Sequence, residues 1–199
     1  MKIFQIGFNR CGTTSIYSFF NSNCEKKLKC LHWERGGLAS NIFSNLVNKK
    51  PLLDGKYENY NVYTDMQAFI KKPDGKMILF LAHIDCYKLL DDQYPNSKFI
   101  LNTRSVENWI ASRIVHYGER DMRLMEEIYN TKDILKVWGQ QWSNHHNDVV
   151  NYFAKKNNLL IFNIEKDSGK KIANFFPELK FKSDEFPKIR SLDQKNSKY

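Results

Sequence analysis

The opening stretch of the sequence places the strongest constraint on the fold. Residues 3–15 read Ile-Phe-Gln-Ile-Gly-Phe-Asn-Arg-Cys-Gly-Thr-Thr-Ser. The apolar run is typical of a strand buried on both faces of a parallel sheet. It leads into a loop from Gly7 to Gly12 and then into a hydroxyl-rich segment that predicts a helix start. Backbone N–H groups converge in such a loop, where the helix dipole is positive, so we expect an anion to bind there.

The rest of the chain alternates predicted strands with predicted helices. Further strands are expected at residues 29–33, 62–66, 98–103 and 159–164. Helices are expected at residues 13–21, 38–47, most of 78–94, 105–114, 121–129, 131–156 and 168–176. This alternation predicts an α/β fold with three α/β/α layers around a mainly five-stranded parallel sheet, as in the P-loop NTPases. We expect a single domain over residues 1–190 and a disordered tail at 191–199.

Polar residues follow the predicted strands where they end. Besides the first loop, these strand ends are His32-Trp33, Thr64-Asp65, Thr103-Arg104 and residues 163–165. Ligands of parallel α/β sheets bind at the carboxyl ends of the strands, so these clusters should line one cleft.

The first loop differs from a nucleoside triphosphate P-loop at one informative position. Gly7, Gly12 and Thr14 match the Gly-x-x-x-x-Gly-Lys-Ser/Thr pattern, but Thr13 stands where the lysine should be. Arg104 occupies the end of a strand where a metal-binding carboxylate would be expected. This pattern argues against γ-phosphate chemistry, which depends on Mg²⁺, and favours transfer of a less highly charged group without a metal.

Two segments together resemble the sulfotransferases that use 3′-phosphoadenosine 5′-phosphosulfate (PAPS). Ile-Gly-Phe-Asn-Arg-Cys-Gly-Thr-Thr-Ser at 6–15 resembles their 5′-phosphosulfate loop, commonly Lys-x-Gly-Thr-Thr-Ser. Phe-Ile-Leu-Asn-Thr-Arg at 99–104 with Ser112 resembles their strand, arginine and later serine that bind the 3′-phosphate. The resemblance covers most of residues 2–165 and is closest to the small bacterial-type members.

The resemblance implies roles for particular residues. The 5′-phosphosulfate would be held by Arg10, Cys11, Gly12, Thr13, Thr14 and Ser15, and the 3′-phosphate by Arg104 and Ser112 with Arg113 close by. Arg10 departs from the family's usual lysine; it can stabilise charge on the leaving oxygen but hardly donates a proton. Lys188 and Arg190 could close over the nucleotide as C-terminal basic loops do in related enzymes, although a solvated basic tail is an equal alternative.

Transfer to a hydroxyl, or less readily an amine, also needs a base for the acceptor's proton. His32 is the first candidate because it ends the second predicted strand and imidazole titrates near neutrality. Asp65 is the second, either as the base or as a group that orients the histidine or the acceptor. Each has an ordinary alternative: His32 could be a core histidine beside Trp33, and Asp65 could be a helix cap or the partner of a tyrosine. Cys11 lies at a helix N-terminus, which can lower a thiol pKa, but a small loop filler is the more frequent role.

Composition sets the remaining expectations. Lysine and arginine number 31 against 22 aspartates and glutamates, a net charge of +9 that suits an anionic partner or simply a basic surface. Four cysteines without a Cys-x-x-Cys pair, no secretory signal and no long apolar run predict a reduced, cytoplasmic protein.

We therefore expect a PAPS-dependent sulfotransferase that releases adenosine 3′,5′-bisphosphate (PAP) by in-line transfer, with a small-molecule, lipid or saccharide acceptor that the sequence does not identify. The alternatives are a P-loop nucleotide kinase or NTPase, and a non-catalytic nucleotide- or nucleic-acid-binding module, for which no nucleic-acid motif is present.

Overall fold

A parallel sheet of five strands forms the centre of the protein, in the order β2-β3-β1-β6-β7. The structure, a computed structural model, describes residues 1–189 apart from the side chain of Arg120; Arg190 and the predicted disordered tail at 191–199 lie outside the described residues. The strands are β1 (Ile3–Gln5), β2 (Cys30–His32), β3 (Val62–Thr64), β6 (Lys98–Thr103) and β7 (Leu159–Asn163). All four pairings are parallel. The predicted fold class is confirmed.

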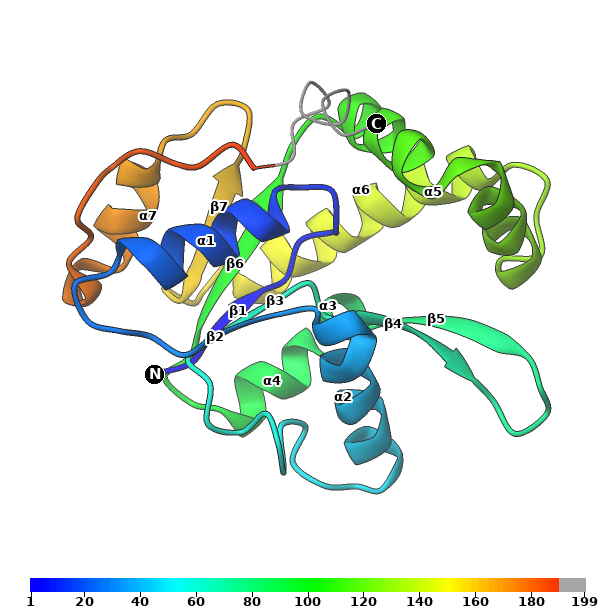
Figure 1. Ribbon diagram of the computed structural model, residues 1–199, viewed down its shortest axis with the longest axis horizontal. Helices are drawn as coiled ribbons and strands as arrows, with labels where there is room; N and C mark the ends of the chain where they lie inside the picture. The colour runs from blue at the N-terminus through cyan, green and yellow to red at the C-terminus, as the bar shows by residue number, and fades with distance from the viewer. Residues whose placement is uncertain (190–199) are drawn as a thin grey trace, which may run out of the picture.

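Helices cover both faces of the sheet (Figure 1). One face carries α1 (Thr13–Asn23), α7 (Gly169–Phe175) and the short η2 (Pro177–Leu179). The other carries α2 (Gly37–Val47), α3 (Ala82–Asp85), α4 (Tyr87–Gln93) and the end of α6 (Ile134–Phe153). The short η1 (Glu34–Gly36) joins β2 to α2, and α5 (Val106–Ile128) packs along α6.

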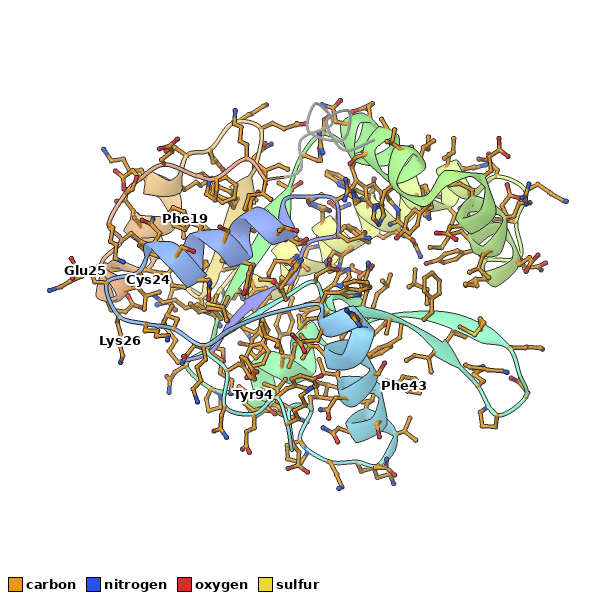
Figure 2. The ribbon with its side chains drawn as sticks, in the orientation of Figure 1. Phe19, Cys24, Glu25, Lys26, Phe43 and Tyr94 are labelled. Carbon is orange, nitrogen blue, oxygen red and sulfur yellow. The ribbon has the colours of Figure 1, made fainter. Side chains whose placement is uncertain are left out.

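Aromatic side chains supply much of the core on both faces. Phe19 of α1 lies against Phe181 and Phe186, which brings the chain after η2 back over the first helix. Figure 2 shows Phe19 on this side and Phe43 and Tyr94 on the opposite side of the sheet. Because strand residues alternate between the two clusters, the sheet is buried on both faces, as the apolar strand runs predict.

The helix predicted over most of 78–94 is wrong at its beginning. Met77–Leu81 forms β5, which pairs antiparallel with β4 (Gln67–Lys71) in a separate hairpin. The spacing of Leu79, His83 and Tyr87 fits a helix, but a short apolar run fits a strand equally well. The turn after Lys71, with Asp74-Gly75 in it, closes the hairpin, and α3 and α4 begin only after Leu81.

The two helices predicted on either side of Gly118 form one element with a break in it. Gly118 has φ 67° and ψ 179° inside α5, which interrupts the helix there. Such an angle is readily adopted only by glycine. The break redirects the second half of α5 over the β4–β5 hairpin, with which α5 is in contact through β5 (Figure 1).

Candidate active site

The loop between β1 and α1 is built around one buried side chain from the neighbouring strand. Asn102 of β6 accepts a hydrogen bond from the Gly7 N–H at 3.0 Å and donates to the Cys11 carbonyl at 2.7 Å. A Cβ on Gly7 would lie 2.0 Å from the Asn102 carbonyl oxygen, so only glycine permits this approach. Asn102 thus fixes both ends of the loop, a role that no motif in the sequence indicates.

The loop delivers α1 with its N-terminus open. Gly12 precedes the helix with φ 75° and has no side chain to cap it. The first amides of a helix have no intrahelical acceptors, so those that begin at Thr13 remain suited to an anion. Cys11 points the other way: its thiol is fully buried, and burial raises its pKa to about 12 despite nearby arginines. The expected lowering of the thiol pKa is therefore wrong, and the Cys11 side chain fills the loop while its backbone N–H donates to the Phe8 carbonyl at 3.3 Å.

His32 lies directly against this helix start. One ring nitrogen, Nε2, is 3.2 Å from the Thr14 hydroxyl, and the other, Nδ1, is 2.9 Å from the Thr64 hydroxyl. Thr64 donates its single proton to the Leu31 carbonyl at 3.0 Å, so it can only accept from the histidine. This network assigns the proton to Nδ1 and leaves the Nε2 lone pair facing Thr14. His32 is thus held at the loop by its hydrogen bonds and by stacking on Tyr17.

Asp65 also lies at this edge of the sheet, one residue after β3. Its backbone has φ 55°, and its N–H donates to the Gln5 side chain at 2.8 Å. Gln5 in turn donates to Asn102 and to the Gly7 carbonyl. A buried glutamine therefore connects the predicted second base to the anion loop, a link that the sequence offered no signal for.

Arg104 lies where the sequence placed it, just beyond β6, and is held by two contacts. Its Nε is 3.2 Å from Glu165, and its Nη1 donates to the Arg10 carbonyl at 3.3 Å. Partial burial would raise the pKa of Glu165, but hydrogen bonds from the Ser105 N–H and Asn108 and the charge of Arg104 hold it below its usual value. Glu165 is a positioning group that the strand-end pattern had marked only as part of 163–165.

Arg10 and Ser112, predicted for opposite ends of the nucleotide, are in contact. The Arg10 Nε donates to the Ser112 hydroxyl at 3.3 Å. Arg10 has φ 63°, a left-handed conformation that is uncommon outside glycine. The loop therefore sends its arginine towards α5, beside the residues predicted for the 3′-phosphate.

Arg113 does not lie open beside Ser112 as the sequence suggested. Its side chain is 1% exposed, and the guanidinium carbon lies 4.0 Å from the Trp138 ring centroid and 4.8 Å from that of Trp109. Burial lowers its pKa, partly offset by Tyr117, Tyr129 and Cys11. Trp109 donates to the Asn9 carbonyl at 2.9 Å, so this aromatic cage supports the loop from behind. Arg113 is a buried cation under the loop rather than a surface ligand.

The end of the described chain passes over the start of α1. The Ile189 N–H donates to the Ser15 hydroxyl at 3.1 Å, and Phe186 packs on Phe162 of β7. Lys188 lies exposed next to this contact. Residues 186–189 thus lie beside the start of α1, and closure of Lys188 and Arg190 over a nucleotide stays a prediction, since Arg190 lies outside the described residues.

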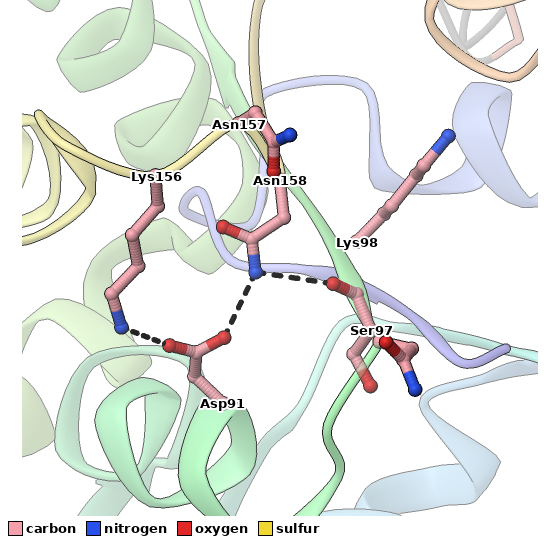
Figure 3. Close-up of a pocket in the computed structure, with 7 residues that line it drawn as sticks. Asp91, Ser97, Lys98, Lys156, Asn157 and Asn158 are labelled. Carbon is pink, nitrogen blue, oxygen red and sulfur yellow. Dashed lines mark hydrogen bonds and ion pairs between the residues drawn. The ribbon is translucent and has the colours of Figure 1, made fainter.

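A second region that resembles a site lies at the other edge of the sheet. A cavity of about 630 Å³ is lined by Asp91, Ser97, Lys98, Lys156 and Asn158 and two further asparagines. Figure 3 shows that its polar groups bind one another: Asp91 pairs with Lys156, and Asn158 donates to Asp91 at 2.9 Å and to the Ser97 carbonyl at 3.1 Å. These residues precede β6 and β7, at the amino ends of the strands, where α/β proteins do not usually bind ligands. They join α4 to the sheet.

The described part of the chain shows no group of three or more His, Cys, Asp or Glu side chains arranged to hold a metal ion. Within residues 1–189, no helix combines the length and the apolar character that crossing a membrane requires.

A parallel sheet that is covered by helices on both faces, and whose first strand leads through a glycine-flanked loop into a helix, defines a three-layer α/β/α protein. The loop has Thr13 in place of the triphosphate lysine and carries an arginine three residues earlier, at Arg10, and a second arginine and a serine lie beside it. Comparison with known protein families identifies the family to which this arrangement belongs. The family model for the sulfotransferase domain matches residues 2–130, which include the loop, His32, Asp65, Arg104 and Ser112. The chain belongs to this sulfotransferase family, and its activity is sulfotransfer. No curated protein matches the chain.

Proposed function

We propose that the protein transfers the sulfuryl group of PAPS to an acceptor hydroxyl and releases PAP. The observation that carries this proposal is that Arg10 contacts Arg104 through its carbonyl and Ser112 through its side chain, although Arg10 lies far from both in the sequence. Two arginines and a serine beside an open helix N-terminus make a site for two anionic groups rather than one.

The hydrogen-bonding groups at the site suit the two anionic groups of PAPS. The first amides of α1, with Thr13, Thr14 and Ser15, would hold the 5′-phosphosulfate. Arg104 and Ser112 would hold the 3′-phosphate. Because Arg10 reaches Ser112, we assign it to the side of the 3′-phosphate as well as to the loop. PAPS supplies a sulfuryl group that is already activated by its bond to phosphate.

The protein's own groups then handle the acceptor proton. His32 presents the unprotonated Nε2 towards Thr14, so it is the base that we assign, and Asp65 orients the acceptor from the end of β3. The amides of α1 and the arginines stabilise the negative charge that develops on the leaving oxygen. The four cysteines are free thiols, which agrees with the reduced, cytoplasmic location that we propose.

Equilibrium binding of PAP and of ATP, with and without Mg²⁺, tests the proposal. We expect PAP to bind without metal and more tightly than ATP. Arg104→Ala should weaken PAP binding about tenfold to a hundredfold, since a hydrogen bond to a charged group contributes about 1.5–3 kcal/mol. Arg123→Ala, which removes an exposed charge from the same helix as Ser112, is the matched control and should change little.

Each alternative predicts a different outcome. A nucleotide kinase or NTPase would bind ATP more tightly than PAP and would require Mg²⁺. A nucleic-acid-binding module would bind RNA or DNA in a salt-sensitive way that survives both Arg10→Ala and Arg104→Ala.

A further inference from the structure

A small cavity lies beside the candidate active site, among residues that follow β2 and β3. Its volume is about 380 Å³, within the range of small-molecule sites. Three parts of the chain line it: the segment around η1, the β4–β5 hairpin and α5. The residues that matter below are Trp33, Arg35, Phe69, Leu79, Tyr117 and Asp121.

Covalent and hydrogen-bonded links place this cavity next to the reacting groups. Trp33 directly follows His32 in the chain. Tyr117 accepts a hydrogen bond at 3.0 Å from the side chain of Asn9, which belongs to the anion loop. A molecule in the cavity would therefore lie beside the end of β2, which carries the base, and beside the loop.

The walls of the cavity are aromatic and exposed. Trp33 is 45% exposed and Phe69 is 41% exposed, and both line the cavity. Phe69 pairs with Leu79 across the hairpin, so one face of β4–β5 offers an apolar surface to the cavity. Large exposed apolar side chains gathered in one hollow indicate a binding surface.

The backbone at Trp33 supports this interpretation independently. Trp33, Glu34 and Arg35 have φ values of 56°, 51° and 54° in succession. Positive φ is unusual for bulky residues and persists where the surrounding structure imposes it. The fold therefore holds the Trp33 indole at the cavity against its backbone preference.

The charged side chains that line the cavity balance each other, so they do not favour a strongly charged acceptor. Arg35 and Asp121 contribute one charge of each sign. The apolar rings instead favour a flat ring, which packs against Trp33 and Phe69. A hydroxyl on an aromatic ring also suits a histidine base, because phenols ionise near pH 10 whereas unactivated water ionises near 15.7.

From the cavity we infer that the acceptor is a small phenolic compound, a hydroxyl carried on a flat aromatic ring; the inference rests on the proposed function. The acceptor oxygen forms a bond to sulfur while the bond from sulfur to the bridging phosphate oxygen breaks. The electron pair of that bond stays on PAP, and the phenolic proton moves to Nε2 of His32.

The test compares 2-naphthol with decahydro-2-naphthol, which has the same skeleton but no flat ring. We expect 2-naphthol to bind the protein in calorimetry without any donor, and to gain labelled sulfate from PAPS with a kcat/KM at least about tenfold higher. Phe69→Ala should weaken 2-naphthol binding about tenfold, because it removes most of a buried ring contact. Phe69→Tyr, which keeps the ring, should bind 2-naphthol about as tightly as the unaltered protein does.

Leu89→Ala is the matched control because Leu89 is similarly exposed, at 39%, but lies on α4 away from the cavity. The phenolic assignment would be overturned if the protein sulfated 2-naphthol and decahydro-2-naphthol equally well. It would also be overturned if Phe69→Ala left 2-naphthol binding unchanged. In both cases PAP binding would stay intact. If the unaltered protein did not bind PAP, the proposed function itself would be overturned. The two failures are therefore distinguishable.

Discussion

The hydrogen bond from His32 to Thr64 gives the sharpest prediction about the proposed chemistry. Thr64 is fully buried and donates to the Leu31 carbonyl, so its oxygen is the acceptor that keeps the proton on Nδ1 of His32. Thr64→Val preserves the shape but removes that acceptor. Water cannot replace it at a buried position, so a proton left on Nδ1 would lack a partner.

The structure sets the size of the effect. A buried donor without a partner costs about 1–3 kcal/mol. His32 avoids this cost by carrying its proton on Nε2, and that tautomer has no lone pair towards Thr14. The productive form should become about 5-fold to 150-fold rarer, since 1.4 kcal/mol corresponds to a factor of ten. His32→Ala removes the base altogether and should lower kcat about 10²-fold to 10⁴-fold.

Steady-state kinetics with PAPS and 2-naphthol measure this, with PAP binding as the control for the nucleotide site. We expect Thr64→Val to lower kcat and to leave the affinity for PAP within about twofold of the original. Its kcat should still be higher than that of His32→Ala. Thr64→Ser keeps the hydroxyl and should recover most of the activity. Thermal unfolding separates the loss of the bond to Leu31 from the effect on catalysis. If the valine and serine variants had equal kcat, the assigned tautomer would be refuted.

Two further predictions concern the groups that support the loop. Asn102→Ala leaves buried loop amides and carbonyls without partners, which should destabilise the protein by about 3 kcal/mol and lower Tm by about 10 °C in a thermal melt; an unchanged Tm would contradict the role assigned to Asn102. His145 is buried, which lowers its pKa to about 4 from 6.5, so stability is full above pH 6.5 and falls as the pH decreases and the unfolded chain takes up the proton. Urea unfolding should show about 1.5 kcal/mol lost from this group between pH 6.5 and 5, and a His145→Gln variant as pH-sensitive as the original would exclude it.

The regular part of the fold could be predicted from sequence because its signals are local. Apolar runs of the right length marked all five strands of the sheet, and the alternation with helices determined that it is parallel. The β4–β5 hairpin was missed because Leu79, His83 and Tyr87 also satisfy a helical spacing. The Asp74-Gly75 pair is typical of a turn, but no local signal shows that the residues on both sides of it pair.

The candidate site was predictable to the extent that it follows from strand ends. His32, Asp65 and Arg104 were placed correctly at one edge of the sheet because parallel strands end together. Asn102 and Gln5 were not found, because their roles depend on which strands are neighbours and on how closely Gly7 approaches β6. No spacing in the sequence carries that information.

Arg113 shows that the type of a residue does not reveal whether its side chain is buried. A cation next to Ser112 suggested a phosphate ligand, but α5 turns that position inward, among Trp109 and Trp138. Buried there, the charge still lies close behind the loop, since it lowers the pKa of Cys11 against the larger effect of burial. It therefore contributes positive potential behind the loop that we propose binds the phosphosulfate.

Arg10 is the position where the chain departs from the common form of its family, and the structure suggests what the change does. A lysine would offer one point charge, whereas the guanidinium spreads its donors across a plane. In this protein the plane reaches the Ser112 hydroxyl, while the Arg10 carbonyl accepts from Arg104. One residue thus joins the first loop to both groups expected at the 3′-phosphate. The two phosphate sites that we propose therefore form one connected unit, and a change at either end should alter the other.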